Sequence, residues 1–253
     1  VAAEDDDDDD DDVDAYAATT ASEAWARFER LVKVLSDSGA LADGRPTNLG
    51  RLVTNIRGDN ELLLALCLTH GATASVAAEA SVGEFAALCS ALVNESGDRR
   101  NAFVDHGPSK AVRRATDALW DGVLLPLSDA QYAAGLDGAD ASLSLDDSAA
   151  GLVEAWADGA SWAQIAESTS LDHGDLIRLF RRTLDVLKTT AALPLDLAPD
   201  AFAHVAAAAR SAADAVDRPP VRDDQFDAIF VADDDDDDAR EEEAGGGAAD
   251  PDD

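Results

Sequence analysis

The chain has 253 residues, with 53 acidic and 19 basic side chains and a formal net charge of −34. Most of this charge lies in residues 1–14 and 223–253, which leaves a net charge of −10 for residues 15–222. The total charge therefore does not exclude a negatively charged partner for the central part. The chain has no apolar run of ~18–20 residues, which excludes a membrane span and predicts no membrane partner.

The first predicted segments are the two acidic ends, 1–14 and 223–253. We expect both to be disordered tails, because like charges repel and expose no apolar surface to bury. Their composition is more typical of solubilising segments than of binding segments. Residues 15–222 are enough for a sizeable core and by length fit one large domain or two small ones. Of these we expect one helical domain, with a variable loop near 135–148. The chain contains no Met and begins at Val1, which favours a fragment or a processed product.

Apolar residues recur with a helical period along nearly the whole central part. The predicted helices, in chain order, cover residues 20–39, 59–71, 81–96, 109–127, 152–159, 161–169, 172–190 and 199–216. The fourth is expected to be interrupted near Gly122. Capping boxes predict three of the helix starts, at Thr20–Glu23, Ser81–Glu84 and Ser161–Gln164. No alternating strand-like run competes, so the predicted fold class is all-α, a helical bundle.

Motifs for catalysis are missing from the chain. It contains no phosphate-binding P-loop, no H-E-x-x-H and no G-x-S-x-G, so it is not expected to catalyse a reaction alone. Cys67 and His70 are three residues apart, a spacing that metal ligands use, but no second pair accompanies them. A packed, reduced thiol is the better interpretation of Cys67, and also of Cys89, which lies in a similar apolar pattern.

The stretch GDLIRLFRRTLDVLKTT (174–190) gathers basic residues in an acidic chain. On a helical wheel its apolar stripe leaves a second face that carries the basic residues and Asp185. Periodicity alone favours an ordinary surface helix with local ion pairs. A face that contacts phosphates or bases is the other interpretation, since Arg offers planar, forked donors. This second face of the predicted helix consists of Arg178, Arg181, Arg182, Asp185 and Lys188.

Two further interpretations concern the same region. Residues 161–185 have a helix, turn, helix pattern that also occurs in DNA-binding regulators, although the domain is acidic overall. A helical interaction module without a nucleic-acid role is the third possibility, and burial of the basic face of 178–188 would favour it.

Three blocks of sequence, in this order and spacing, resemble one family. The blocks are TNLGRLVTNIRGDNELLLALCL (47–68), EFAALCSALVNES (84–96) and LVEAWADGASWAQIAESTSLDHGDLIRLFRRTLDVLKTT (152–190). They resemble the C-terminal helical domain, called DSHCT, of superkiller-type DExH-box RNA helicases, especially the cyanobacterial and plastid branch. With its flanks the resemblance spans residues 22–222.

The resemblance implies a function. In such helicases the domain packs on two RecA-like motor domains upstream in the same polypeptide, and one helix, the ratchet helix, contacts single-stranded RNA. The family pattern falls on residues 173–185, with His173 in place of the usual acidic residue. It implies Arg182 and Asp185 as the RNA-facing pair, with Arg178 and Arg181 supporting them or packing on the motor.

The resemblance also implies where the rest of the activity lies. No cofactor is expected in this chain, because ATP and Mg²⁺ belong to the motor domains, which the chain lacks. The parent protein is then an ATP-dependent RNA helicase in RNA processing or decay. Its branch favours the plastid, with the cytoplasm as the alternative.

Overall fold

The structure is a computed structural model that describes residues 8–94, 105–136 and 143–222. The remaining residues of the predicted acidic tails, 1–7 and 223–253, lie outside this range, and their disorder stays a prediction. The helices are α1 (Asp8–Asp37), α2 (Asn48–Val53), α3 (Glu61–Thr69), α4 (Gly71–Glu79), α5 (Val82–Ala91), α6 (Lys110–Leu119), α7 (Leu125–Ala134), α8 (Ala150–Ala157), α9 (Trp162–Glu167), α10 (His173–Ala192) and α11 (Phe202–Val216). The all-α fold class is confirmed.

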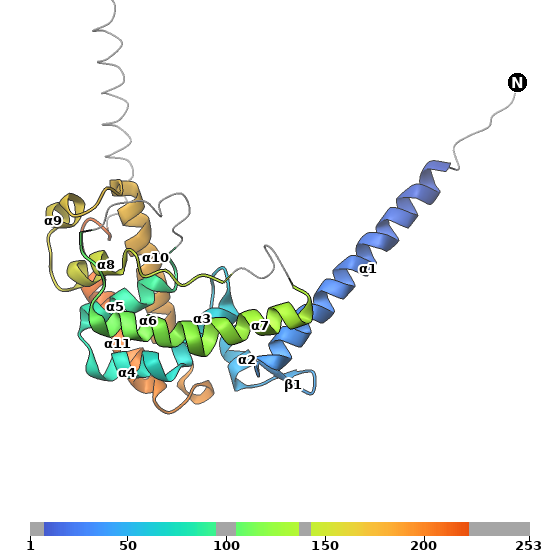
Figure 1. Cartoon of the computed structure of the whole chain (residues 1–253), viewed down its shortest axis with the longest axis horizontal. Coiled ribbons are helices and arrows are strands. Elements are labelled where there is room, and N and C mark those ends of the chain that lie inside the picture. The colour runs from blue at the N-terminus through green and yellow to red at the C-terminus, as the bar shows by residue number, and fades with distance from the viewer. Residues whose placement is uncertain (1–7, 95–104, 137–142, 223–253) are drawn as a thin grey trace, which may run out of the picture.

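The central helix of the bundle is α5. It is surrounded by α6, α8, α10 and α11, and its residues from Phe85 to Ala91 are all buried. α10 also packs along α11, so that α5, α10 and α11 contact one another in pairs. Figure 1 shows α10 running through this bundle, while α1 extends away from it. The predicted Ser81–Glu84 capping box is present and begins α5.

α1 differs from the prediction in its start and in its packing. It begins at Asp8, so Thr20–Glu23 lies inside the helix and is not its start, and the helix includes part of the predicted tail 1–14. The apolar repeat predicted for this helix is largely exposed: Trp25 is 61% and Phe28 is 53% accessible. The reason is geometric, because α1 contacts α7 and β1, and Figure 1 shows its N-terminal part projecting away from the bundle.

A small hairpin follows α1. Strands β1 (Leu41–Ala42) and β2 (Arg45–Pro46) pair antiparallel around Asp43 and Gly44, which have φ angles of 50° and 70°. Both lie in the left-handed region that glycine and Asp tolerate better than most residues. This hairpin and the short helix α2 after it were not predicted.

Two helix boundaries of the core also differ from the prediction. The helix predicted for 59–71 ends at Thr69, and a second helix, α4, begins at once, because the His70 side chain caps its first turn through Nδ1 and the Ala72 N–H. The interruption predicted near Gly122 is a π-helical turn, η2 (Trp120–Leu124), between α6 and α7. The N–H groups in the first turn of a helix have no partner within that helix, so Pro126, which has no N–H, is tolerated at the start of α7.

The segment after α10 closes the domain. A 3₁₀ turn, η4 (Leu195–Leu197), leads to α11, and residues 217–222, called the C-terminal segment below, return to α10. The predicted variable loop of 135–148 begins at Gly135 in the left-handed conformation that ends α7. Part of that loop, 137–142, lies outside the described residues.

Candidate nucleic-acid interface

α10 carries the predicted site and is held by a broad buried surface. Asp172 caps it, with Oδ1 accepting the Asp175 N–H at 2.6 Å. All members of the predicted apolar stripe are buried: Leu176, Ile177, Phe180, Leu184 and Leu187. Leu179, Thr183, Val186 and Thr190 are buried as well. The exposed part of α10 is therefore a narrow band with two edges. The residues at one edge contact residues 217–222, whereas those at the other edge line a pocket.

One edge, called the anchored edge below, faces the C-terminal segment. Arg181 Nε donates to the Val221 carbonyl oxygen at 3.2 Å, and Lys188 Nζ lies 3.2 Å from Asp217 Oδ2. Arg222 Nε also contacts Asp217, at 3.1 Å from Oδ1. Burial alone would raise the pKa of Asp217, but the hydrogen bonds and charges of Arg222 and Lys188 outweigh it and lower the pKa. Arg181 and Lys188 thereby hold the C-terminal segment against α10.

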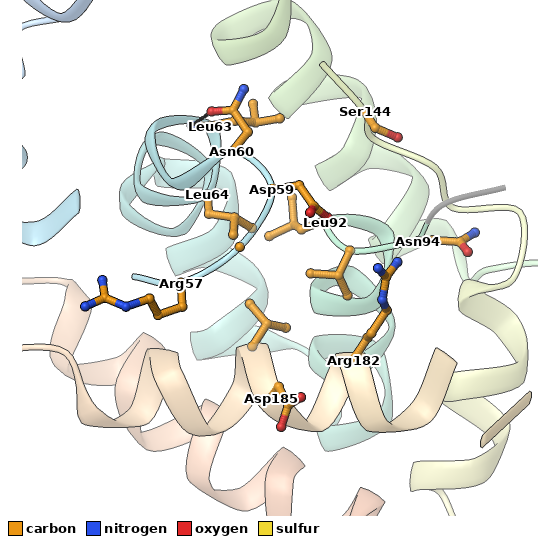
Figure 2. A pocket seen from close by; sticks show the side chains of 13 residues that line it. Arg57, Asp59, Asn60, Leu63, Leu64, Leu92, Asn94, Ser144, Arg182 and Asp185 are labelled. Carbon is orange, nitrogen blue, oxygen red and sulfur yellow. Dashed lines mark hydrogen bonds between the residues drawn. The ribbon is translucent and has the colours of Figure 1, made fainter. Parts of the chain in front are cut away.

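The other edge, called the open edge below, consists of Arg182 and Asp185. Both line a pocket of roughly 340 Å³, within the range of small-ligand sites. Figure 2 shows Arg182 pointing from α10 into the pocket towards Asn94, whereas the Asp185 side chain lies on the face of α10 and points away from Arg182. Arg182 is half-buried, whereas Asp185 is exposed.

The pocket has an apolar floor and a polar rim. Its floor consists of leucine and valine side chains that are each at most 8% accessible: Leu63, Leu64, Leu92 and Val186. Opposite α10, the loop between α2 and α3 contributes Arg57 and Asp59. Asn94, after α5, completes the rim beside Arg182 (Figure 2), with Nδ2 3.4 Å from both Asp146 O and Ser148 Oγ.

Arg57 and Asp59 were not predicted as site residues. The signal for them was the polar break RGDN (57–60), which interrupts the apolar pattern inside the block 47–68. Periodicity marks such a break only as a turn. Its position across a pocket from α10 depends on the packing of α3 and α5, which the sequence pattern does not specify.

The structure separates the four predicted site residues. It brings Arg182 and Asp185 to one pocket, but Arg181 lies at the anchored edge. Arg178 lies outside the pocket, exposed, with Nη1 3.2 Å from Asp175 Oδ1. Burial of the basic face of 178–188 would have favoured an interaction module without a nucleic-acid role. The side chains of this band of α10 are exposed or half-buried, so that condition is not met. Contact of these residues with RNA stays a prediction.

Comparison with known proteins identifies the family. The model of the DSHCT (NUC185) domain matches residues 43–224 of the chain. The chain belongs to the DSHCT family. It is also similar to the DExH-box ATP-dependent RNA helicase DExH15, chloroplastic, of Arabidopsis thaliana, with 33% identity over 201 residues. This match covers 78% of the chain but 16% of that relative, so the chain spans a small part of its length.

An aromatic cluster sets the position of α10 in this DSHCT domain. Phe180 lies 5.4 Å from Trp156 and 6.1 Å from Trp162, measured between ring centroids. Trp162 Nε1 donates to His173 Nδ1 at 3.0 Å, so the histidine that departs from the family pattern joins α9 to the first turn of α10. Arg218 stacks on Trp156, with its guanidinium carbon 3.3 Å from the ring centroid. The cluster thus fixes α10 from the side opposite the pocket rim.

The helix-turn-helix pattern of 161–185 is present as α9 and α10. In DNA readers of this type the first residues of the second helix contact base edges, close to phosphates. In this DSHCT domain that end carries Asp172 and Asp175, whose carboxylates would repel DNA. The pattern here serves to pack two helices through Trp162 and Phe180.

The two cysteines and His70 lie in well-defined surroundings within the described ranges. Burial raises the pKa of the Cys67 and Cys89 thiols to about 12, so both stay protonated. His70 caps α4, with its Nδ1 accepting the Ala72 N–H, and Cys67 is buried in the core. Across the described residues, no group of three or more His, Cys, Asp or Glu side chains is arranged to hold a metal ion.

The length and apolar character of the described helices bear on the predicted lack of a membrane span. None of the described helices is by itself both long and apolar enough to cross a membrane. The pair α3 and α4, bent by 56°, meets the test of length and composition only when taken together. Apolar residues of both helices are buried in the core, among them Leu68 and Val76.

Proposed function

We propose that this DSHCT domain contacts single-stranded RNA through Arg182 and Asp185 of α10, which acts as the ratchet helix of an ATP-dependent DExH-box RNA helicase. The observation that carries the proposal is that these two residues line one open pocket, while Arg181 and Lys188 are engaged with the C-terminal segment. The name of the Arabidopsis relative supports the class of enzyme.

The chemistry of the pair suits an unpaired strand. The guanidinium of Arg182 can donate to a phosphate or stack on a base, and the Asp185 carboxylate can accept from a base edge. Because both side chains project from a rigid, well-buried helix, movement of a motor relative to α10 would move them relative to the strand. Such a contact couples strand movement to the ATPase cycle without itself doing chemistry.

The remaining parts of the proposal concern the parent polypeptide. RecA-like motor domains supply ATP and Mg²⁺ binding, and Arg178, exposed beside the open edge, supports the RNA contact or packs on the motor. Arg181 acts indirectly, by holding the C-terminal segment at Val221. The chloroplastic relative supports a plastid location. A role in RNA processing or decay is proposed from the family.

The test is a double substitution in a polypeptide that joins this domain to its DExH-box motor. Arg182→Ala with Asp185→Ala is expected to reduce unwinding and RNA-stimulated ATP hydrolysis, while the ATP hydrolysis measured without RNA is retained. The matched control is Arg210→Ala with Asp214→Ala, an exposed Arg and Asp of α11 that do not line the pocket. Wild-type unwinding by the first variant would show that α10 is not a ratchet helix.

A further inference from the structure

The described residues that line the pocket beside Arg182 carry charges of both signs. Among the described residues that line it, two are arginines, Arg57 and Arg182, and two are aspartates, Asp59 and Asp185. Grooves that follow a nucleic-acid backbone are positively charged, because phosphates supply most of the attraction. Because the two aspartates would repel a backbone phosphate, a ligand here needs an attraction other than backbone charge alone.

The floor of the pocket supplies the other attraction. Leu64, Leu92 and Val186 present small exposed parts of buried side chains, so the surface is apolar and firmly supported. An unstacked nucleobase has an apolar face and a polar edge, and proteins that bind single strands hold such bases by stacking and by hydrogen bonds to their edges. The floor and rim of this pocket match those two requirements.

The two arginines lie where flanking phosphates would lie. Figure 2 shows Arg57 at one end of the pocket and Arg182 at the other, on opposite walls. The Arg57 guanidinium points away from the pocket, and its Nη1 donates to the Thr54 and Ile56 carbonyl oxygens at 3.2 and 3.1 Å. That orientation suits contact with a phosphate outside the pocket rather than with a base inside it.

We infer that the pocket holds one nucleobase of the RNA strand, with the loop 57–60 as its second wall; this inference rests on the proposed RNA contact of Arg182 and Asp185. The carboxylates of Asp59 and Asp185 accept hydrogen bonds and cannot donate them when ionised. Cytosine presents an amino group where uracil presents the O4 acceptor, and carboxylates pair with that amino group. The pocket therefore selects a base with an exocyclic amino group, cytosine over uracil.

The experiment is a titration of the whole 253-residue chain, labelled with ¹⁵N, with the octanucleotides C8 and U8 and followed by NMR. Resonances of the pocket residues are expected to shift, with C8 binding roughly three- to tenfold more tightly than U8, the gain from one or two hydrogen bonds. Asp59→Asn is expected to remove that preference, and its matched control is Asp129→Asn, an exposed Asp of α7 outside the pocket. Arg57→Gln is expected to weaken binding of both oligonucleotides and to lower the slope of log K against log salt by about 0.7.

The outcomes separate the two proposals. If Arg182→Ala weakens binding but Asp59→Asn leaves an unchanged preference and Arg57→Gln has no effect, the RNA contact of α10 stands and the base pocket is wrong. If neither oligonucleotide shifts any pocket resonance at millimolar concentration, both proposals fail. If duplex DNA binds there more tightly than both single strands, the occupant is a duplex and the base pocket is likewise wrong. Variant spectra that match the wild type away from the pocket exclude misfolding as the cause.

Discussion

The two edges of α10 carry the same kinds of side chain but have different surroundings. At the anchored edge, Arg181 and Lys188 contact Val221 and Asp217 of the C-terminal segment. At the open edge, Arg182 and Asp185 line a pocket with an apolar floor. Arg181 and Arg182 are adjacent in the sequence, yet the first contacts the C-terminal segment and the second lines the pocket. Charge clustering on a helix therefore does not by itself mark a binding face.

The largest expected effect comes from removing the support that both edges share. Phe180 is fully buried between Trp156 and Trp162. Phe180→Ala is expected to lower the free energy of unfolding by about 3–5 kcal/mol, because it leaves a cavity beneath α10. Urea denaturation would measure the change. Tyr132→Ala, which truncates an aromatic residue that is 86% accessible, is expected to stay within about 0.5 kcal/mol of the wild type.

The next effect concerns the open edge alone. Arg182→Ala is expected to weaken binding of single-stranded RNA by roughly 5- to 100-fold, the range found when one stacking or charged contact to a base is lost. The free energy of unfolding is expected to change little, since most of α10's packing is made by other residues. Parallel binding and denaturation measurements test this. A large loss of stability would place Arg182 with the anchored edge.

The opposite pattern is expected at the anchored edge. Arg181→Ala removes the hydrogen bond to the Val221 carbonyl and is expected to cost about 1–2 kcal/mol of stability, because a charged donor is lost at a half-buried site. RNA affinity measured at a temperature where the variant is folded is expected to be unchanged. If Arg181→Ala weakened RNA binding as much as Arg182→Ala, the distinction between the edges would be wrong.

The smallest effect is the ion pair of Lys188 and Asp217. Lys188→Ala is expected to cost about 0.2–1 kcal/mol at neutral pH, the usual range for an exposed pair. The pKa of Asp217 is lowered in the folded state, so its stabilising effect is present above the ordinary Asp pKa of 3.8 and is lost as the pH falls through the folded pKa. Below pH 3.8 the difference between the variant and the wild type should shrink. Acid titration of stability for both proteins measures it.

Local signals predicted the core helices well because their start signals act over short distances. The Ser81–Glu84 and Ser161–Gln164 capping boxes and the Asp172 cap are all present. The same logic was wrong at Thr20, where a capping-box pattern lies inside α1. It also missed α4, because one helix was predicted for 59–71, whereas the His70 side chain starts a new helix there.

The amino-acid sequence by itself determined the all-α class and the two faces of α10, because helical periodicity and capping depend on residues within a few positions of one another. It also contained the blocks that mark the DSHCT family. Only the tertiary structure decided that Arg182 and Asp185 share a pocket with Arg57 and Asp59, and that Arg181 does not. The pocket joins segments more than a hundred residues apart in the numbering, and the Arg181–Val221 contact joins residues 40 apart, so both depend on how α3, α5 and the C-terminal segment pack around α10.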